Sequence, residues 1–93
     1  MITINNQNYN IILNYRDALN KEELETKLTD FYSDYDYIVG DIAYNKLRLK
    51  GFYKENNKKV KDLNNYKYVD TYLKKYCAPD CRHFILEKIN NIE

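Results

Sequence analysis

Near the N-terminus, apolar and polar residues alternate, which is typical of β-strands. Ile2 and Ile4 precede a polar run at residues 5–8, and a second alternating segment follows at residues 9–15. A short, Asn-rich run between two such segments is typical of a tight turn. The pattern therefore predicts a β-hairpin over residues 2–15.

The next segment changes to helical spacing. Leu24, Leu28 and Phe31 recur at the intervals that place side chains on one face of a helix. Asn20 stands before this face and is followed by Glu23, which is the spacing of an N-cap and its capping-box partner. We predict a helix over residues 20–32, with these apolar side chains facing the core.

An interior strand is predicted in the middle of the chain. Residues 35–39 are apolar or aromatic at every position except Asp36. A strand with two apolar faces is covered on both sides by other parts of the protein. Gly40 and Asp41 have the chemistry of a turn, so we expect the strand to end there.

A strand with one basic face is predicted next. Leu47 and Leu49 alternate with three basic residues. These are Lys46, Arg48 and Lys50. Strict alternation would also place Phe52 on the basic face, so we expect a β-bulge at Gly51 that turns Phe52 into the core. The polar residues 54–61 are predicted to form an exposed loop.

Apolar residues at helical spacing predict a second helix over residues 64–77, which Pro79 would end. They are Tyr66, Val69, Leu73 and Tyr76. Residues 82–89 return to alternation and predict a final strand. The order ββαββαβ predicts an α+β fold. We expect a single domain over residues 1–93, with about five strands in a mixed or antiparallel sheet and two packed helices.

Length and composition agree with one small domain outside the membrane. The chain has 93 residues, 44% of them hydrophobic, and no apolar run approaches the roughly 18 residues that would span a bilayer. The N-terminus lacks the basic start and apolar block of an export signal, so we expect a cytoplasmic protein. In that setting Cys77 and Cys81 are expected to be reduced thiols rather than a disulfide.

One group of residues that could carry chemistry is the Cys-x3-Cys-x-His segment, formed by Cys77, Cys81 and His83. It offers two thiols and an imidazole, which suit a redox switch or a metal site. Zinc usually takes four such ligands, and the sequence offers no second pair. Helix-end and strand-start cysteines more often pack as small apolar residues, so we expect no metal and no cofactor.

The strongest charge feature is basic. The net charge of the whole chain is only +1, yet residues 46–76 carry ten Lys and Arg against three Asp and Glu. Side chains on one strand face repeat about every 7 Å, which is close to the spacing of phosphates along a single nucleic-acid strand. The candidate binding residues are Lys46, Arg48, Lys50, Lys54, Lys58 and Lys59. Their partner would be RNA, a ribonucleoprotein or an acidic protein surface; a solvated face balanced by the acidic N-terminal half is the alternative.

Enzymatic chemistry finds less support in the sequence. Asp34, Asp36 and Asp41 flank the interior strand, but Asp beside glycine or at a strand end is ordinary turn chemistry. Phosphate-binding glycine loops and metalloprotease motifs are absent from the sequence, and a catalytic triad would depend on the single histidine. We therefore assign no catalytic residue and expect a binding module. A protein–protein adaptor that uses a sheet edge is a further alternative.

Several stretches resemble the YutD-like family of uncharacterised proteins from low-GC Gram-positive bacteria. They are residues 35–41, Tyr44, residues 47–53, Tyr72-Leu73, Tyr76-Cys77, Cys81, Phe84 and Leu86-Glu87. The similarity extends over roughly residues 9–89. Family members often carry Trp-Gly where this chain has Ile42-Ala43. The resemblance implies a compact α+β domain in a bacterial cytosol and brings no mechanism with it.

Overall fold

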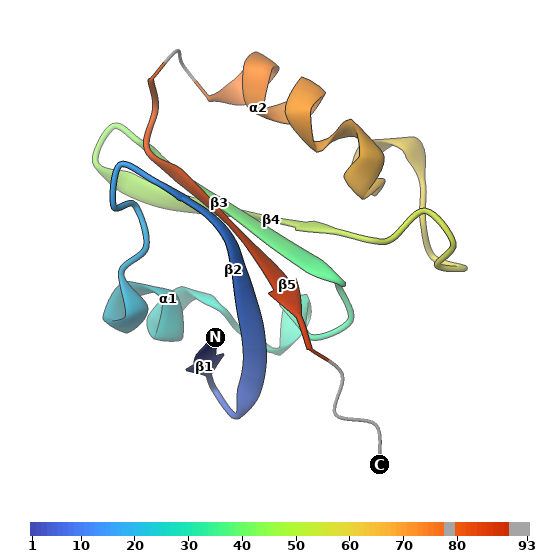
Figure 1. Ribbon diagram of the computed structural model, residues 1–93, viewed down its shortest axis with the longest axis horizontal. Helices are drawn as coiled ribbons and strands as arrows, with labels where there is room; N and C mark the ends of the chain where they lie inside the picture. Colours follow the sequence, from blue (N-terminus) through green and yellow to red (C-terminus); the bar gives the residue numbers. More distant parts are fainter. Residues whose placement is uncertain (78–79, 90–93) are drawn as a thin grey trace.

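A computed structural model describes residues 1–77 and 80–89 (Figure 1). Its five strands form one antiparallel sheet with the order β1-β2-β5-β3-β4. The strands are β1 (Ile2–Ile4), β2 (Gln7–Tyr15), β3 (Tyr37–Ala43), β4 (Lys46–Phe52) and β5 (His83–Lys88). The helices are α1 (Lys21–Lys27) and α2 (Val69–Tyr76), with 3₁₀ turns η1 (Asp30–Tyr32), η2 (Asp62–Asn64) and η3 (Tyr66–Tyr68). The α+β fold and its element order are confirmed, and the sheet is antiparallel.

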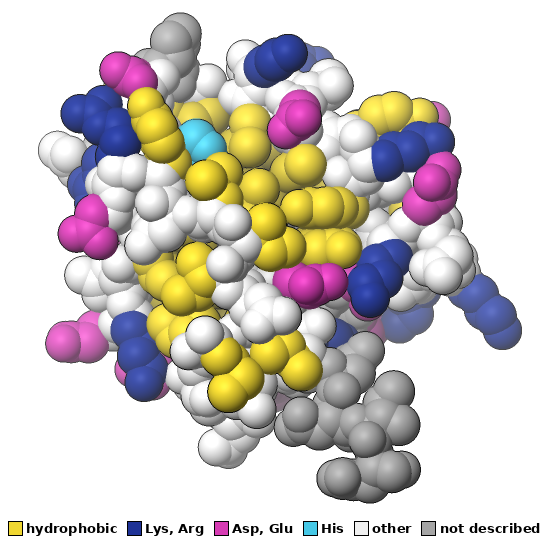
Figure 2. All heavy atoms as spheres, in the orientation of Figure 1, with side chains coloured by type: hydrophobic (Ala, Val, Ile, Leu, Met, Phe, Trp, Pro, Cys, Tyr) yellow, Lys and Arg dark blue, Asp and Glu magenta, His cyan; other side chains and the backbone are white. Residues whose placement is uncertain are grey.

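The sheet has apolar side chains on both faces, and one helix packs on each (Figure 1). Leu24 of α1 packs with Phe84 and Leu86 on one face. Val69 of α2 packs with Phe52 and other residues on the opposite face. Figure 2 shows hydrophobic side chains gathered over the strands in the middle of the view, with charged groups around them. Two small cores therefore hold the sheet between two helices.

The N-terminal hairpin and the start of α1 confirm their predictions. Asn5 and Asn6 both have positive φ (50° and 69°), which is the conformation of a two-residue hairpin turn. Asn20 caps α1 because its side chain accepts a hydrogen bond from the Glu23 amide at 3.0 Å. The Asn5 side chain in turn donates to the Leu28 carbonyl at 2.8 Å, which binds the hairpin to the end of the helix.

The first helix is shorter than predicted. It ends at Lys27, and residues 30–32 form the separate turn η1. Thr29 lies in an extended conformation (φ −90°, ψ 177°) and separates the two, because Thr and Asp favour caps and turns over a helix interior. Phe31 is consequently 71% exposed instead of facing the core.

The interior strand is confirmed, because β3 pairs with β4 on one side and β5 on the other. Its bounds were predicted wrongly, since Gly40 and Asp41 lie inside the strand. Gly40 stands opposite Phe84, and a Cβ atom there would overlap the Phe84 ring. The glycine therefore makes room for a core ring, while Asp41 is buried with a charged partner described below.

The predicted bulge at Gly51 is wrong. The pairing of β3 with β4 runs without a shift from Tyr37↔Phe52 to Ala43↔Lys46. Phe52 therefore shares the face of the basic residues, and it is only 1% exposed because α2 covers that face. Gly51 serves the other face, where the Tyr35 ring occupies the space that a Cβ atom would need. The structure does contain a register shift in β2, between Ile11 and Leu13.

The second helix also starts later than predicted. Two 3₁₀ turns precede α2, and Asn65 between them is extended, with its side chain accepting a hydrogen bond from the Lys67 amide. This local bond competes with a continuous helix. The final strand is confirmed over residues 83–88 and lies in the middle of the sheet. Pro79 lies outside the described residues. Within the described ranges, no helix is long and apolar enough to cross a membrane.

Candidate functional site

The basic face of β4 is tied to the core by one ion pair. Arg48 contacts the carboxylate of Asp41 through Nη2 at 2.5 Å and Nε at 3.3 Å, and Asp41 is only 1% exposed. The hydrogen bond that Arg48 donates to Asp41 and the negative charge of that carboxylate raise the pKa of the Arg48 guanidinium. Arg48 also donates to the Tyr76 carbonyl at 2.9 Å. It therefore neutralises a buried acid and holds the end of α2 against the sheet.

The other five predicted cations differ in their surroundings. Lys59 pairs with Asp34 at 2.7 Å, and this hydrogen bond and charge lower the pKa of Asp34. Lys46, Lys54 and Lys58 are exposed. Lys50 is half-buried, and its Nζ lies 5.8 Å from the centre of the Phe52 ring. Lys46 and Lys50 are therefore the two lysines of β4 that lie on the face covered by α2.

The loop after β4 is held by Asp36, which belongs to the acidic N-terminal half of the chain. One carboxylate oxygen of Asp36 accepts from the Lys54 amide at 2.8 Å and from Nδ2 of Asn57 at 3.1 Å. Asp36 therefore fixes the start of the loop that carries Lys54 and Lys58. The acid that pairs with Arg48 of β4 is Asp41.

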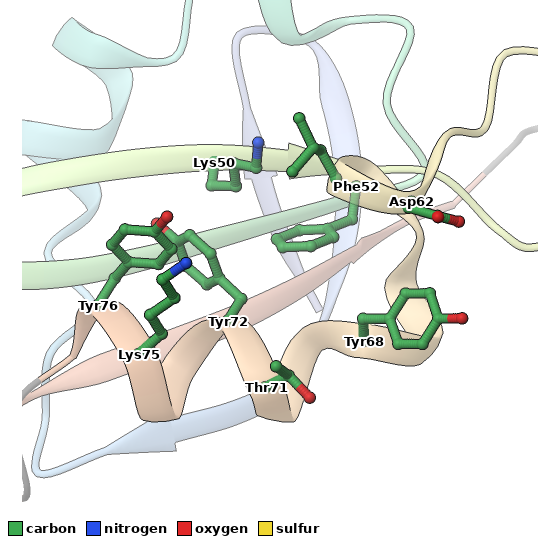
Figure 3. A pocket seen from close by; sticks show the side chains of 9 residues that line it. Lys50, Phe52, Asp62, Tyr68, Thr71, Tyr72, Lys75 and Tyr76 are labelled. Atoms are coloured by element: carbon green, nitrogen blue, oxygen red, sulfur yellow. The ribbon is translucent and has the colours of Figure 1, made fainter.

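A hollow lies between β4 and the α2 layer, and we call it the α2 pocket (Figure 3). Its volume is about 350 Å³. Its lining is Lys50, Phe52, Asp62, Leu63, Tyr68, Thr71, Tyr72, Lys75 and Tyr76. Phe52 forms the buried floor, whereas Leu63 is 85% exposed at the rim. The pocket therefore offers aromatic and aliphatic surface that solvent can reach.

Two lysines and one acid, Asp62, line this apolar pocket, so the sum of its charges is positive. Lys75 Nζ lies 5.4 Å from the centre of the Tyr76 ring. Lys50 Nζ lies over the Phe52 ring in a similar way, at 5.8 Å. Both ammonium groups are thus held beside aromatic faces. Burial raises the pKa of the Tyr72 phenol, so this ring stays neutral at physiological pH. The arrangement suits a ligand with an apolar or aromatic body and flanking negative charges.

The Cys-x3-Cys-x-His segment departs from expectation. Cys77 and Cys81 form a disulfide, which corrects the prediction of two reduced thiols. α2 ends at Tyr76, and the Cα atoms of Cys77 and Cys81 lie 5.6 Å apart, within the usual range for a disulfide. His83 lies beside the pair, with Nδ1 3.8 Å from Cys77 Sγ and 2.8 Å from the Cys81 carbonyl oxygen.

Sequence reasoning missed the contribution of α2 to the candidate site. Lys75, Tyr76 and Leu63 line the pocket, although none of them was assigned a binding role. A signal was present in the alternation of β4, which placed Phe52 on the basic face. A phenylalanine among cations indicates that another element covers part of that face, and the helix with the next apolar stripe is the natural candidate.

Fold and site together define a small open-sheet α+β protein with a basic, aromatic pocket. Comparison with known proteins gives the family. The family model described as "Putative antitoxin YutD-like" matches residues 3–87, so the chain belongs to the YutD-like family.

Two relatives support this assignment. The protein named "Putative antitoxin YutD" from Bacillus subtilis (strain 168) is 37% identical over 89 residues, which cover 96% of this chain and 98% of the relative. The solution NMR structure of protein yutD from B. subtilis has 36% sequence identity and a TM-score of 0.80. That match covers 100% of this chain and 84% of the NMR chain. The fold described above is therefore the fold of this family.

Proposed function

We propose that this chain is a protein-binding module that holds an acidic segment of a partner protein in the α2 pocket. The observation that carries the proposal is the pairing of an apolar pocket with two lysines held at its rim, Lys50 and Lys75. Buried apolar anchors supply most of the affinity in protein interfaces, while charges at the rim select the partner. An acidic peptide with one large apolar side chain matches both features.

The name of the B. subtilis relative supports a protein partner. The relative is named "Putative antitoxin YutD". One kind of antitoxin acts by binding a toxin protein, and a partner of that kind would suit the pocket. A pocket that is open to solvent and lined by Tyr68, Tyr76 and Leu63 is suited to this task, because tyrosine is enriched at interfaces. Acidic partners would also be attracted by the basic C-terminal half of the chain.

Single-stranded RNA is the second candidate partner, and a separate observation favours it. Four aromatic rings line the pocket beside basic residues of β4 and the following loop, and bases stack on such rings without sequence preference. The rings are Phe52, Tyr68, Tyr72 and Tyr76. Lys46, Lys54 and Lys58 would then contact phosphates. The pairing of Arg48 with Asp41 and of Lys59 with Asp34 weakens this candidate, because both cations are already neutralised.

Two probes separate the candidates. The first is a labelled peptide with a central Phe flanked by Glu residues, compared with versions in which Phe becomes Ala or Glu becomes Gln. The second is an oligouridine strand of matched charge. We expect the acidic Phe peptide to shift the amide signals of α2 and β4, and both altered peptides to bind at least tenfold more weakly. Stronger binding of oligouridine, with an affinity that falls steeply with salt, would favour RNA instead.

Variants locate the binding surface on the protein. Leu63→Ala and Lys75→Glu should each weaken the acidic peptide, and both positions are exposed, so the fold should tolerate them. The matched control is Lys21→Glu at the first position of α1, on the opposite side of the sheet, where a negative charge suits a helix start. Equal loss of binding in the control and in Lys75→Glu would contradict the pocket. Arg48→Glu is avoided, because it would place a second acid beside buried Asp41.

A further inference from the structure

Three side chains that the proposed function does not use form a compact cluster of metal ligands. They are Cys77, Cys81 and His83, and their ligand atoms all lie within 4.8 Å of one another. Cys77 is buried, while Cys81 and His83 are half-buried, so the cluster is shielded but can be reached from solvent. It joins the end of α2 to the start of β5.

The surrounding structure fixes the position of His83. Its ring lies 5.1 Å from that of Tyr15, its cross-strand neighbour on β2. The Tyr15 hydroxyl donates to Asp80 at 2.5 Å, and Arg16 reaches the carbonyl of the same residue at 3.1 Å. Tyr15 of β2 therefore contacts both the imidazole and Asp80, and Arg16 just after β2 also contacts Asp80. The histidine is thus already placed when the cysteines change state.

We propose that, with its disulfide reduced, this chain binds one zinc ion through Cys77, Cys81 and Nδ1 of His83, with water as the fourth ligand. Thiolates and imidazoles are the preferred zinc ligands. Ligand atoms around one tetrahedral zinc stand roughly 3.3 to 3.8 Å apart, given zinc–ligand bonds of about 2.0 to 2.3 Å. The cluster needs only small movements to reach this geometry. The sequence expectation of no metal rested on ligand count, and our proposal departs from it because the folded chain brings the three ligand atoms together.

Reduction and zinc binding are linked steps. Two molecules of a low-molecular-weight thiol reduce the disulfide to two cysteine thiols and are themselves oxidised to one disulfide. Zinc then displaces the two thiol protons, and its bond to Nδ1 replaces the contact between Nδ1 and the Cys81 carbonyl. Hydrogen peroxide reverses the state: with two protons it takes two electrons from the thiolates, forms the disulfide and two water molecules, and releases zinc.

The consequence is a segment with two mutually exclusive cross-links. Either the disulfide or the zinc ion connects the end of α2 to β5, and both sulfur atoms are needed for each. Tyr76 of the α2 pocket immediately precedes Cys77. Zinc occupancy would therefore report the thiol state of the protein directly beside its proposed binding surface.

The test compares zinc binding by the reduced and the oxidised full chain. Protein reduced with a phosphine in oxygen-free buffer competes with a colorimetric chelator for zinc, and cobalt serves as a spectroscopic substitute. We expect one zinc per reduced chain and none per oxidised chain. Cobalt should give the sulfur-to-metal charge-transfer absorption of thiolate ligands. Peroxide should release the zinc as the thiols disappear.

Variants separate a metal site from adventitious binding. Cys81→Ser and His83→Gln should each weaken zinc binding at least tenfold, while Glu25→Gln on the opposite side of the sheet should leave it unchanged. Amide spectra of the reduced variants confirm that each is folded. The proposal is overturned if folded, reduced wild-type protein does not bind zinc at micromolar concentration. It is equally overturned if His83→Gln binds zinc as tightly as the wild type, or if the oxidised chain does.

Discussion

At the scale of single residues, the pair of Asp41 and Arg48 explains why a charged side chain can sit inside an interior strand. Asp41 is buried in β3 and faces Arg48 directly across the β3–β4 pairing. A buried carboxylate without a partner is strongly unfavourable, so Arg48 is required where Asp41 is present. Arg48 also accounts for the position of α2, because it reaches the Tyr76 carbonyl at the end of that helix.

This pair gives a stability prediction. Arg48→Gln should lower the free energy of unfolding by about 1 to 3 kcal/mol, less than for a fully buried pair because solvent reaches the guanidinium. Asp41→Asn combined with Arg48→Gln should lose less than the sum of the single changes, since neither charge is then left alone. Urea unfolding of the four proteins measures the coupling. If the losses in free energy of unfolding from the two single changes simply add up, Asp41 and Arg48 do not stabilise each other.

The same residues show why the sequence predicted the basic face of β4 but did not reveal that Arg48 on it is paired with an acid. Alternation predicted which side of β4 the cations occupy, because period-two patterning is a local property. Their neutralisation depends on register: Arg48 meets Asp41 only because β3 and β4 pair without a shift. Register and strand order are long-range properties, and a single sequence does not reveal them. The disulfide was missed for the same reason, since the expectation relied on compartment and not on the distance between the cysteines.

At the scale of elements, the two glycines show how a strand makes room for an aromatic ring from another segment. Gly40 lies beneath Phe84 and Gly51 beneath Tyr35, each on the α1 side of the sheet. Sequence reasoning assigned one glycine to a strand end and the other to a bulge, which are the commonest uses of glycine in strands. Both instead receive a ring from another segment, and only the folded structure shows which ring that is. The bounds of the helices and strands were harder to predict than their number and order.

The interior position of β3 predicts its protection from hydrogen exchange. Its amides are paired on both sides and covered by both cores, so they should exchange only when the protein unfolds globally. Amides of residues 54–61 should exchange many times faster, because this loop is largely exposed. Exchange measured by NMR at neutral pH compares the two segments. Similar rates in both would be inconsistent with the sheet order described above.

At the scale of the whole molecule, buried tyrosines predict a loss of stability at alkaline pH. Burial raises the pKa of Tyr9, Tyr37, Tyr66 and Tyr72 above the ordinary value of 10.0. The unfolded chain therefore releases these protons at lower pH than the folded protein does. Their contribution to stability is fully present below pH 10 and is lost as the pH rises through the raised values.

Urea unfolding at increasing alkaline pH measures this effect. The free energy of unfolding should fall above a pH of about 10. Tyr66→Phe should make the fall shallower, because one phenol no longer ionises on unfolding. Tyr44→Phe is the matched control, since Tyr44 is exposed and should not contribute. An identical pH dependence in wild type and Tyr66→Phe would contradict the raised pKa of the Tyr66 phenol, which stacks on the Tyr37 ring.

As proposed above, the α2 pocket holds a protein partner. The most direct measurement places a photoreactive amino acid at position 63, at the rim of the pocket, and cross-links in the cells that make the protein. The control carries the same amino acid at position 21 on α1. We predict an adduct specific to position 63 that protease destroys and nuclease leaves intact. An adduct that nuclease removes, or equal labelling from both positions, would contradict the claim.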